Sequence, residues 1–523
     1  MQRPTIGGPT VRRLLRTIQA IALLLGFYAM ALAILAVIAL VDDAVISAAM
    51  RSEQGLGLWS VLAVSVLLAY PLVRGLLMGH PGNRHRPPGI RVSPQEQPRL
   101  WQRVRAAAEA AGVRPPSGLW LVDVPNASVW QGSWLLGLIP GRRRMMIGLP
   151  LLSGLTVAEL DAVIAHELGH FANGDTLLLG LTARSRAGLG QVVSGYSAKE
   201  GGLGHGLNGL FTRYARFCLR VTQAGARRQE LAADAAAARL TGPETVIRAL
   251  RATPLLTRAH ERYRSEYVEI GAPQELGPRA EEIQPGFRRF LETASWREEA
   301  AALRRNPSRE RRSVYDSHPP VSERIAHLQG LGEVAREPRA ELLEPAHTLL
   351  DDADATAGRA CARRRGAAGL RQVDWDALAA ACGNAELEKE SAALWAAVRA
   401  ALRRKSDLPE LLDAIDAGRW REITGWMPRE GMSRTVTSDA ARSMGSAAAS
   451  DALYSLLLAQ LIAQGRGRWT LDWEQGGKRL DLDPGLDALL GPAVDAVADA
   501  EPPSAAPLRA LLSAPVPAAR AAQ

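Results

Sequence analysis

Two long apolar runs dominate the start of the chain, Ile18–Val41 and Leu56–Val73. The first run carries no charged residue and is longer than the about 20 residues that a helix needs to cross the hydrocarbon core of a bilayer. A signal peptide has a shorter apolar region, of roughly 7–15 residues. We therefore predict two transmembrane helices in a membrane anchor over residues 1–88, with a buried core helix as the alternative for each run.

The charges that flank these runs predict the orientation of the anchor. Arginines precede the first run and follow the second, whereas the segment between the runs has one arginine, Arg51, among the acidic residues Asp42, Asp43 and Glu53. Positively charged residues stay on the cytoplasmic side of a membrane. We therefore predict a multi-pass protein of the plasma membrane whose remaining chain faces the cytoplasm.

Beyond the anchor the apolar positions become short and periodic. Gln95–Ala111 has the pattern of an amphipathic helix, and Gly118–Val124 and Arg142–Leu149 have that of short buried strands. Thr156 and Glu159 have the spacing of a capping box, which predicts that a helix begins there. A few strands among helices indicate an α+β, mainly helical domain.

The helix that begins at Thr156 carries the spacing His-Glu-x-x-His, formed by His166, Glu167 and His170. Residues four apart lie on one face of a helix, so both imidazoles project toward one point. Histidine is only 9 of the 523 residues, so chance would produce this pattern in roughly one chain in a hundred. A metal site is therefore favoured over two solvated histidines.

A catalytic zinc site takes three protein ligands and leaves a fourth position to water. The stretch "RRQELAADAAAARL", which starts at Arg227, offers Glu230 as a third ligand and Asp234 one turn later. Asp234 is suited to accept a hydrogen bond from a ligand histidine and so to select its tautomer. On its own this pair would be an ordinary solvated face of an alanine-rich helix.

Composition narrows the range of functions. Apolar residues make up 47% of the chain, which excludes a disordered protein. The three cysteines are far apart, which argues against a disulfide scaffold and against a thiolate zinc site. The formal charge is +9, but no motif interleaves aromatic and basic residues, and arginine is also enriched at the cytoplasmic side of membrane proteins. We therefore expect no nucleic acid partner.

Four blocks in this order resemble the HtpX and CAAX prenyl protease family of membrane zinc metallopeptidases: "PNASVWQG", "VIAHELGHFANGD", "RRQELAADAAA" and "SHPPVSERIAHL". The resemblance implies a zincin-like peptidase domain over residues 89–332 that holds one zinc ion. It implies that His166, His170 and Glu230 bind this ion, that Glu167 is the catalytic glutamate, and that Asp234 orients a ligand histidine.

Two further roles are predicted around this site. His318, between a serine and two prolines, is a candidate donor to the oxygen that gains charge during catalysis, although it could instead cap or support the following helix. Arg324 in the same block could anchor the loop by pairing with a carboxylate. The strands at 126–130 and 145–148 are candidate exposed edges for substrate, which makes Asn126, Ala127 and Met146 candidate substrate-binding residues.

The chain departs from the family between the two metal blocks, where HtpX-like members usually have further membrane helices. Residues 176–222 contain no apolar run of that length. We predict that Leu210, Tyr214, Phe217 and Val221 form one face of a helix there, with arginines on another face. This pattern fits an interfacial helix over anionic lipid and a core helix with a solvated basic face equally well.

After Gly332 the chain becomes rich in alanine, leucine and aspartate. We predict a mostly helical domain over residues 333–500, with a hairpin in "RWTLDWEQGGKRLDLD" about Gly476 and Gly477, and a loose tail over residues 501–523. No catalytic pattern is found in this part.

The sequence thus predicts a membrane-anchored zinc endopeptidase that acts on protein or peptide substrates, and the resemblance implies a role in quality control of membrane proteins. The alternative is a non-catalytic, metal-stabilised membrane scaffold. The presence of Glu167 argues against this alternative, because a structural zinc site needs no general base and keeps no open position.

Overall fold

The computed structural model describes residues 9–52, 58–78, 89–134, 139–172, 188–196, 202–306, 319–332, 340–365, 369–427, 438–499 and 503–514. These residues belong to two compact units. Unit 1 consists of Met1–His260, Gln284–Leu291 and Arg297–Ala367, and unit 2 of Glu261–Ile283, Glu292–Trp296 and Ala368–Gln523. The domain boundaries expected from the sequence, at residues 88, 332 and 500, stay predictions.

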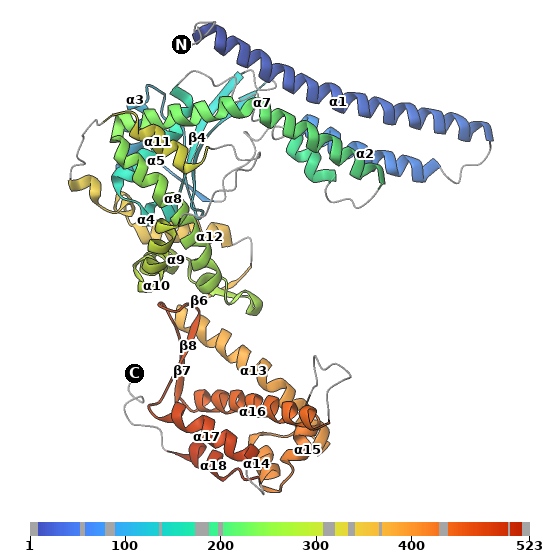
Figure 1. Cartoon of the computed structure of the whole chain (residues 1–523), viewed down its shortest axis with the longest axis vertical. Coiled ribbons are helices and arrows are strands. Elements are labelled where there is room, and N and C mark those ends of the chain that lie inside the picture. The colour runs from blue at the N-terminus through green and yellow to red at the C-terminus, as the bar shows by residue number, and fades with distance from the viewer. Residues whose placement is uncertain are drawn as a thin grey trace. The chain divides into compact units, whose positions relative to one another are not determined.

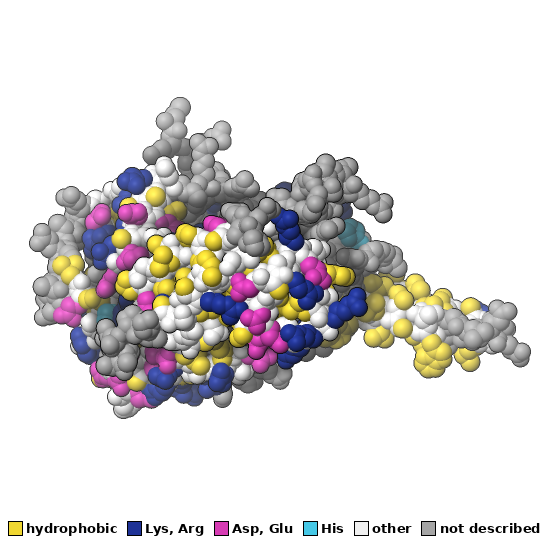
Figure 2. All heavy atoms as spheres, turned by 90° about the horizontal axis from the view of Figure 1, so that it is seen from below, with side chains coloured by type: hydrophobic (Ala, Val, Ile, Leu, Met, Phe, Trp, Pro, Cys, Tyr) yellow, Lys and Arg dark blue, Asp and Glu magenta, His cyan; other side chains and the backbone are white. Residues whose placement is uncertain are grey.

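Unit 1 begins with two apolar helices, α1 (Pro9–Ser52) and α2 (Leu58–Met78), as predicted. Both are long and apolar enough to cross a membrane by length and composition. Many of their large apolar side chains face outward, and Leu40 is 69% exposed and Trp59 79% exposed. In the space-filling view the arm at the right is covered mostly by hydrophobic side chains (Figure 2). Such a surface is typical of a contact with lipid rather than with water.

The described helices between the two metal blocks pack against this anchor. A helix over residues 188–196 and the first half of α7 (Gly202–Thr241) form one apolar cluster with α1 and α2, which includes Phe27, Leu72, Val192 and Phe211. Two hydrogen bonds tie the helices together: the Tyr196 hydroxyl donates to the Leu68 carbonyl at 2.5 Å, and the Tyr214 hydroxyl to the Leu23 carbonyl at 2.7 Å. Figure 1 shows α7 lying beside α1 and α2.

The apolar face predicted for this part of α7 is only partly buried. Tyr214 and Val221 pack on the apolar cluster formed with α1 and α2, but Leu210 is 41% exposed and Phe217 is 53% exposed. Phe211 and Cys218 are buried in their place. The buried face is therefore rotated, because contacts with α1 and α2 select it rather than the apolar periodicity of the helix alone.

After the two apolar helices, unit 1 contains one four-stranded sheet with the strand order β1-β2-β4-β3. Its strands are β1 (Gly89–Val92), β2 (Leu119–Val122), β3 (Ala127–Trp134) and β4 (Ile139–Gly148). The two strands predicted from the sequence correspond to β2 and β4. β4 pairs with β2 on one side and β3 on the other, so the prediction that Met145–Gly148 offers an exposed edge is wrong.

Of the helices in this part of the chain, α4, α5 and α12 contact the sheet. The helices are α3 (Pro98–Ala110), α4 (Leu149–Gly154), α5 (Val157–Ala172), α8 (Pro243–Tyr263), α9 (Ala280–Glu292), α10 (Ala294–Arg305), α11 (Val321–Gln329), η5 (Ala340–Leu343), η6 (Ala346–Leu349) and α12 (Ala353–Arg365). The predicted capping box at the start of α5 is present. The Thr156 N–H donates to the Glu159 carboxylate at 3.0 Å, and the Glu159 N–H donates to the Thr156 hydroxyl at 3.3 Å.

A buried polar network that the sequence did not indicate holds the end of β2. The Asp123 carboxylate accepts hydrogen bonds from His260 at 3.3 Å and from Gln284 at 3.1 Å. The Arg364 guanidinium donates to the Asp123 carbonyl. These contacts join β2 to α8, α9 and α12, and they satisfy a carboxylate that is 1% exposed.

Unit 2 is mostly helical, as predicted for this part of the chain. Its further elements are η3 (Arg264–Val268), η4 (Ala272–Gln274), β5 (Leu276–Pro278), β6 (Arg371–Val373), α13 (Trp375–Leu402), α14 (Leu408–Asp416), α15 (Trp420–Gly425), α16 (Ser438–Ala463), β7 (Gly467–Leu471), β8 (Lys478–Leu482), α17 (Leu486–Asp499) and α18 (Ala506–Ser513). β7 and β8 form the predicted hairpin, in which Gly476 and Gly477 adopt φ angles of 89° and 78°.

A third helix, over Met444–Ala463, is also long and apolar enough to span a membrane by length and composition. It is part of α16, which packs against α13, α15, α17 and β7 within unit 2. Leu453, Leu457 and Leu461, at helical spacing, are completely buried. These contacts are typical of the central helix of a helical domain.

Candidate metal centre

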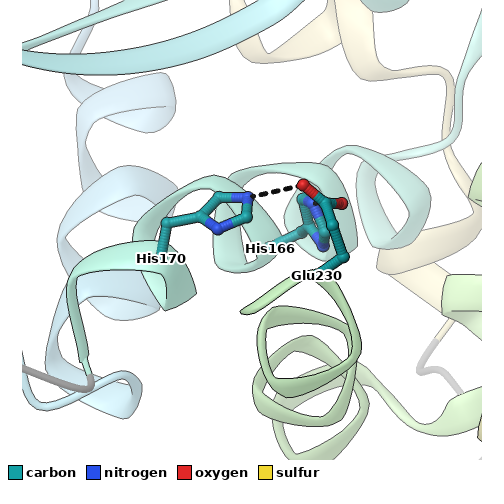
Figure 3. Close-up of side chains that lie close together, drawn as sticks. All are labelled: His166, His170 and Glu230. Atoms are coloured by element: carbon teal, nitrogen blue, oxygen red, sulfur yellow. Dashed lines mark ion pairs between the residues drawn. The ribbon is translucent and has the colours of Figure 1, made fainter. Parts of the chain in front are cut away.

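The two histidines of the His-Glu-x-x-His motif lie on α5 and face a glutamate on α7 (Figure 3). The imidazole rings of His166 and His170 have centroids 4.9 Å apart. The Nε2 atom of His166 is 3.6 Å from one carboxylate oxygen of Glu230, and the Nε2 atom of His170 is 3.7 Å from the other. The structure thus brings together the three residues predicted as metal ligands.

A close contact between α5 and α7 makes this geometry possible. Gly169 separates the two histidines and faces the alanine-rich part of α7. A Cβ atom at Gly169 would lie 3.2 Å from the Ala233 Cα atom and 3.2 Å from the Ala236 Cβ atom. Few protein contacts are as tight, so a larger residue on either helix would move Glu230 away from the histidines.

Asp234 lies one turn after Glu230 and contacts the other nitrogen of His166. Its Oδ1 atom is 2.9 Å from His166 Nδ1, and the Asp234 side chain is fully buried. A carboxylate can only accept at this position, so a proton lies on Nδ1 and Nε2 is the nitrogen available to a metal ion. This is the contact expected from the sequence.

Arg324 completes the buried cluster from α11. Its guanidinium donates two hydrogen bonds to Asp234, from Nε to Oδ2 at 2.8 Å and from Nη2 to Oδ1 at 2.6 Å. The Nη1 atom of Arg324 is also 3.8 Å from the Glu230 carboxylate. Arg324 thus pairs with a carboxylate, as predicted, and it links α11 to the candidate metal ligands.

The charges of this cluster shift its pKa values. Burial alone would lower the pKa of His166, but contacts with Asp234 and Glu230 outweigh burial and raise it to about 9. Burial alone would raise the pKa of Asp234, but its hydrogen bonds with Arg324 and His166 lower it. The carboxylates therefore favour positive charge between the two imidazoles, which is where a cation would bind.

Glu167 follows His166 on α5 and is half-buried. Its carboxylate contributes to raising the pKa of both His166 and Arg324, so its charge acts at the same cluster. His318 lies outside the described residues, and its predicted role as a donor stays a prediction.

The three candidate substrate-binding residues lie on two neighbouring strands. Ala127 begins β3, is buried, and shares an apolar cluster with Val163 of α5. Asn126 precedes it and is exposed, and Met146 is half-buried on the interior strand β4. β3 therefore lies against α5, which carries the two candidate ligand histidines, whereas β4 is paired on both sides and has no free edge for a substrate.

The donor set fits a divalent metal ion. His166, His170 and Glu230 offer two imidazole nitrogens and a carboxylate oxygen, all within 4.8 Å of one another. Ligand atoms of a tetrahedral zinc site lie roughly 3.4 Å apart, given bonds of about 2.1 Å. Three protein ligands leave a position open for water or substrate, which is the pattern of catalytic rather than structural sites.

Replacing Asp234 by asparagine tests the contact with His166. The amide removes the negative charge that holds the Nδ1 proton, so we expect metal affinity to fall about 10–100-fold. Competition with a fluorescent chelator measures this affinity. Asp161→Asn is the matched control, because Asp161 is a buried carboxylate on α5, the helix of His166, and pairs with Arg103. The proposal fails if both variants bind metal equally well.

Comparison with known proteins agrees with this geometry. The family model described as Peptidase family M48 matches residues 94–331. The Protease HtpX homolog of Trichormus variabilis is 34% identical over 174 residues, which are 31% of this chain and 58% of that protein. The homolog of Acidiphilium cryptum is 34% identical over 165 residues, or 29% and 55% of the two chains.

A longer but weaker match extends over the Protease HtpX homolog of Herminiimonas arsenicoxydans, with 26% identity over 332 residues, 58% of this chain and 98% of that protein. The chain spans little more than half the length of the first relatives it matches, 58% and 55%. No solved structure matches the chain. The family match contains both metal blocks and Arg324, and over residues 94–331 the chain is similar to the M48 peptidases and to HtpX proteases.

Proposed function

We propose that the protein is a membrane-anchored zinc endopeptidase that hydrolyses peptide bonds in protein substrates. The observation that carries this proposal is the convergence of His166, His170 and Glu230, on which the charge of Glu167 also acts. Zinc suits this donor set, because two imidazoles and a carboxylate with an open position are typical of zinc peptidases.

The residues of the chain divide the chemistry among them. When bound, zinc would supply a Lewis acid that lowers the pKa of water and polarises the scissile carbonyl. Glu167 accepts the proton of the attacking water and donates it to the nitrogen of the leaving amine as the C–N bond breaks. Asp234 and Arg324 hold His166 in one tautomer and one orientation throughout.

The free side of β3 supports binding of an extended substrate. β3 is the last strand in the sheet order, and within the described part of the chain no strand pairs with its other side. An extended peptide that adds to such an edge gains main-chain hydrogen bonds whatever its sequence. This mode would suit a peptidase that accepts many protein segments.

The register of the sheet indicates which residues of β3 would bind. The Met145 N–H donates to the Gly118 carbonyl at 3.0 Å, so the backbone of Met145 points toward β2 and away from β3. Val129 lies opposite Met145. In an antiparallel pair both opposite residues then point away from each other, so the N–H and C=O of Val129 face the free edge. Ser128 faces β4 instead.

The flanking charges support a cytoplasmic site. Arginines lie before α1 and after α2, and the helices themselves are long enough to span a bilayer. By the positive-inside rule both ends of this hairpin lie in the cytoplasm, together with the peptidase that follows.

Glu167→Gln is the direct test of catalysis. Glutamine cannot accept a proton, so we expect cleavage of casein to fall at least about 100-fold while zinc content stays at one ion per chain. Zinc is measured by mass spectrometry and cleavage by release of labelled peptides. Cleavage at the wild-type rate would show that Glu167 is not the general base.

Proline substitution separates substrate binding from folding. Val129→Pro removes a donor that faces the free edge, so we expect KM to rise several-fold with zinc content unchanged. Ser128→Pro is the matched control. It removes a donor that faces β4, so it should lower the melting temperature instead. Equal effects of the two variants on KM and on stability would contradict edge binding.

Cysteine labelling tests the orientation. The native cysteines Cys218, Cys361 and Cys382 are buried, so an introduced cysteine can be followed in intact cells. We expect an impermeant maleimide to label a cysteine at Asp43 and to miss one at Arg84 until the cells are lysed. If only the Arg84→Cys variant were labelled in intact cells, the peptidase would lie outside the cell.

A further inference from the structure

The first half of α7 presents two opposite faces. One face packs on the anchor through Phe211, Tyr214 and Cys218. The other face is exposed and carries three arginines, Arg213, Arg216 and Arg220, together with two large apolar side chains, Leu210 and Phe217. Exposed apolar residues between cations are typical of helices that lie at a membrane surface.

Contacts between α7 and α1 indicate how deep in the bilayer the exposed face of α7 lies. Tyr214 bonds to the Leu23 carbonyl, and the ring centroids of Phe211 and Phe27 are 6.3 Å apart. The two helices therefore run in opposite directions, and Arg220 lies beyond Tyr214 toward the start of α1. A rise of 1.5 Å per residue puts Leu23 only about 7.5 Å inside the apolar run that starts at Ile18.

The arginines therefore straddle the end of the apolar layer. Arg213 lies near the level of Leu23, and Arg220 lies about 9 Å from Tyr214 in the direction of the headgroups. Arginine side chains extend along apolar surface and place the guanidinium at the interface. Leu210 precedes Arg213 in α7, so it lies deeper among the acyl chains than Arg213 does.

Charge complementarity identifies the occupant. Guanidinium groups bind phosphate with bidentate hydrogen bonds, and the cytoplasmic leaflet is the source of phosphate at this depth. A soluble protein or a nucleic acid would not reach Leu210 or the level of Arg213. This part of α7 also packs on α1 and α2, which expose large apolar side chains such as Leu25 and Tyr70.

We propose that this face of α7 binds the headgroups of anionic phospholipids in the leaflet next to the peptidase, with Arg213, Arg216 and Arg220 on the phosphates and Leu210 and Phe217 among the acyl chains. This inference rests on the proposed topology. α7 continues without a break to Glu230, so the same lipids would hold the helix that carries a metal ligand at a constant height above the bilayer.

Lipid binding is tested on the full chain in a neutral detergent, with dioleoyl-phosphatidylglycerol and dioleoyl-phosphatidylcholine as probes. Native mass spectrometry counts the lipids that stay bound. We expect the wild type to retain phosphatidylglycerol in preference to phosphatidylcholine. In the variant Arg213→Gln/Arg220→Gln the affinity for phosphatidylglycerol should fall at least about tenfold. The variant Arg213→Lys/Arg220→Lys keeps the charge and should retain most of the binding.

The control is Arg239→Gln/Arg304→Gln, which removes the same charge from exposed positions outside the anchor. Zinc content and melting temperature without lipid verify that each variant is folded. Equal phosphatidylglycerol binding by the wild type and by Arg213→Gln/Arg220→Gln overturns the proposal, as does a loss that the control shares. The readout needs no proteolysis, so a failure here is distinct from a failure of the proposed activity.

Discussion

The contact of α5 with the alanine-rich half of α7 is the constraint on which the site depends. The two histidines belong to one helix and the glutamate to another, so the metal ligands meet only if the two helix axes approach closely. Gly169 permits that approach because it removes the side chain that would strike Ala233 and Ala236. Dispersion contacts between small residues are individually weak, but together they hold the two helices at this close distance.

α7 belongs to two environments at once. Its first half packs among the anchor helices and its second half carries Glu230 and Asp234. The short helix over residues 188–196 and this half of α7 occupy the interval in which HtpX-like members usually have further membrane helices. In this interval the chain thus has helices that pack beside α1 and α2, although no apolar run in it is long enough to span a membrane. The consequence is that one continuous helix leads from the apolar helices α1 and α2 to the candidate metal ligand Glu230.

Charge pairing accounts for the block that follows residue 318. A buried carboxylate is costly unless it is paired and hydrogen-bonded. Arg324 supplies this pairing for Asp234, and Asp234 in turn orients His166. The cluster therefore connects α5, α7 and α11, and the geometry of the ligand histidine depends on a residue 158 positions away. The orientation of His166 therefore depends on how α5, α7 and α11 pack together.

The sequence by itself determined what depends on near neighbours. Apolar runs long enough to cross a bilayer predicted α1 and α2, and the spacing of Thr156 and Glu159 predicted the start of α5. The glycine pair Gly476-Gly477 predicted the hairpin of β7 and β8, and both glycines have positive φ angles. The spacing of four residues put both histidines on one face of a helix. Glu230 and Asp234 were found from their residue types and from the resemblance to the family.

Only the tertiary structure decided what depends on distant partners. Strand order made β4 an interior strand and β3 an edge, although both have similar local patterns. Packing on α1 selected Phe211 rather than Leu210 as the buried residue of α7. The network of Asp123, His260 and Gln284 joins residues more than a hundred positions apart. Periodicity reports which side of an element is apolar, but the identity of its neighbour is set by long-range packing, which no local pattern encodes.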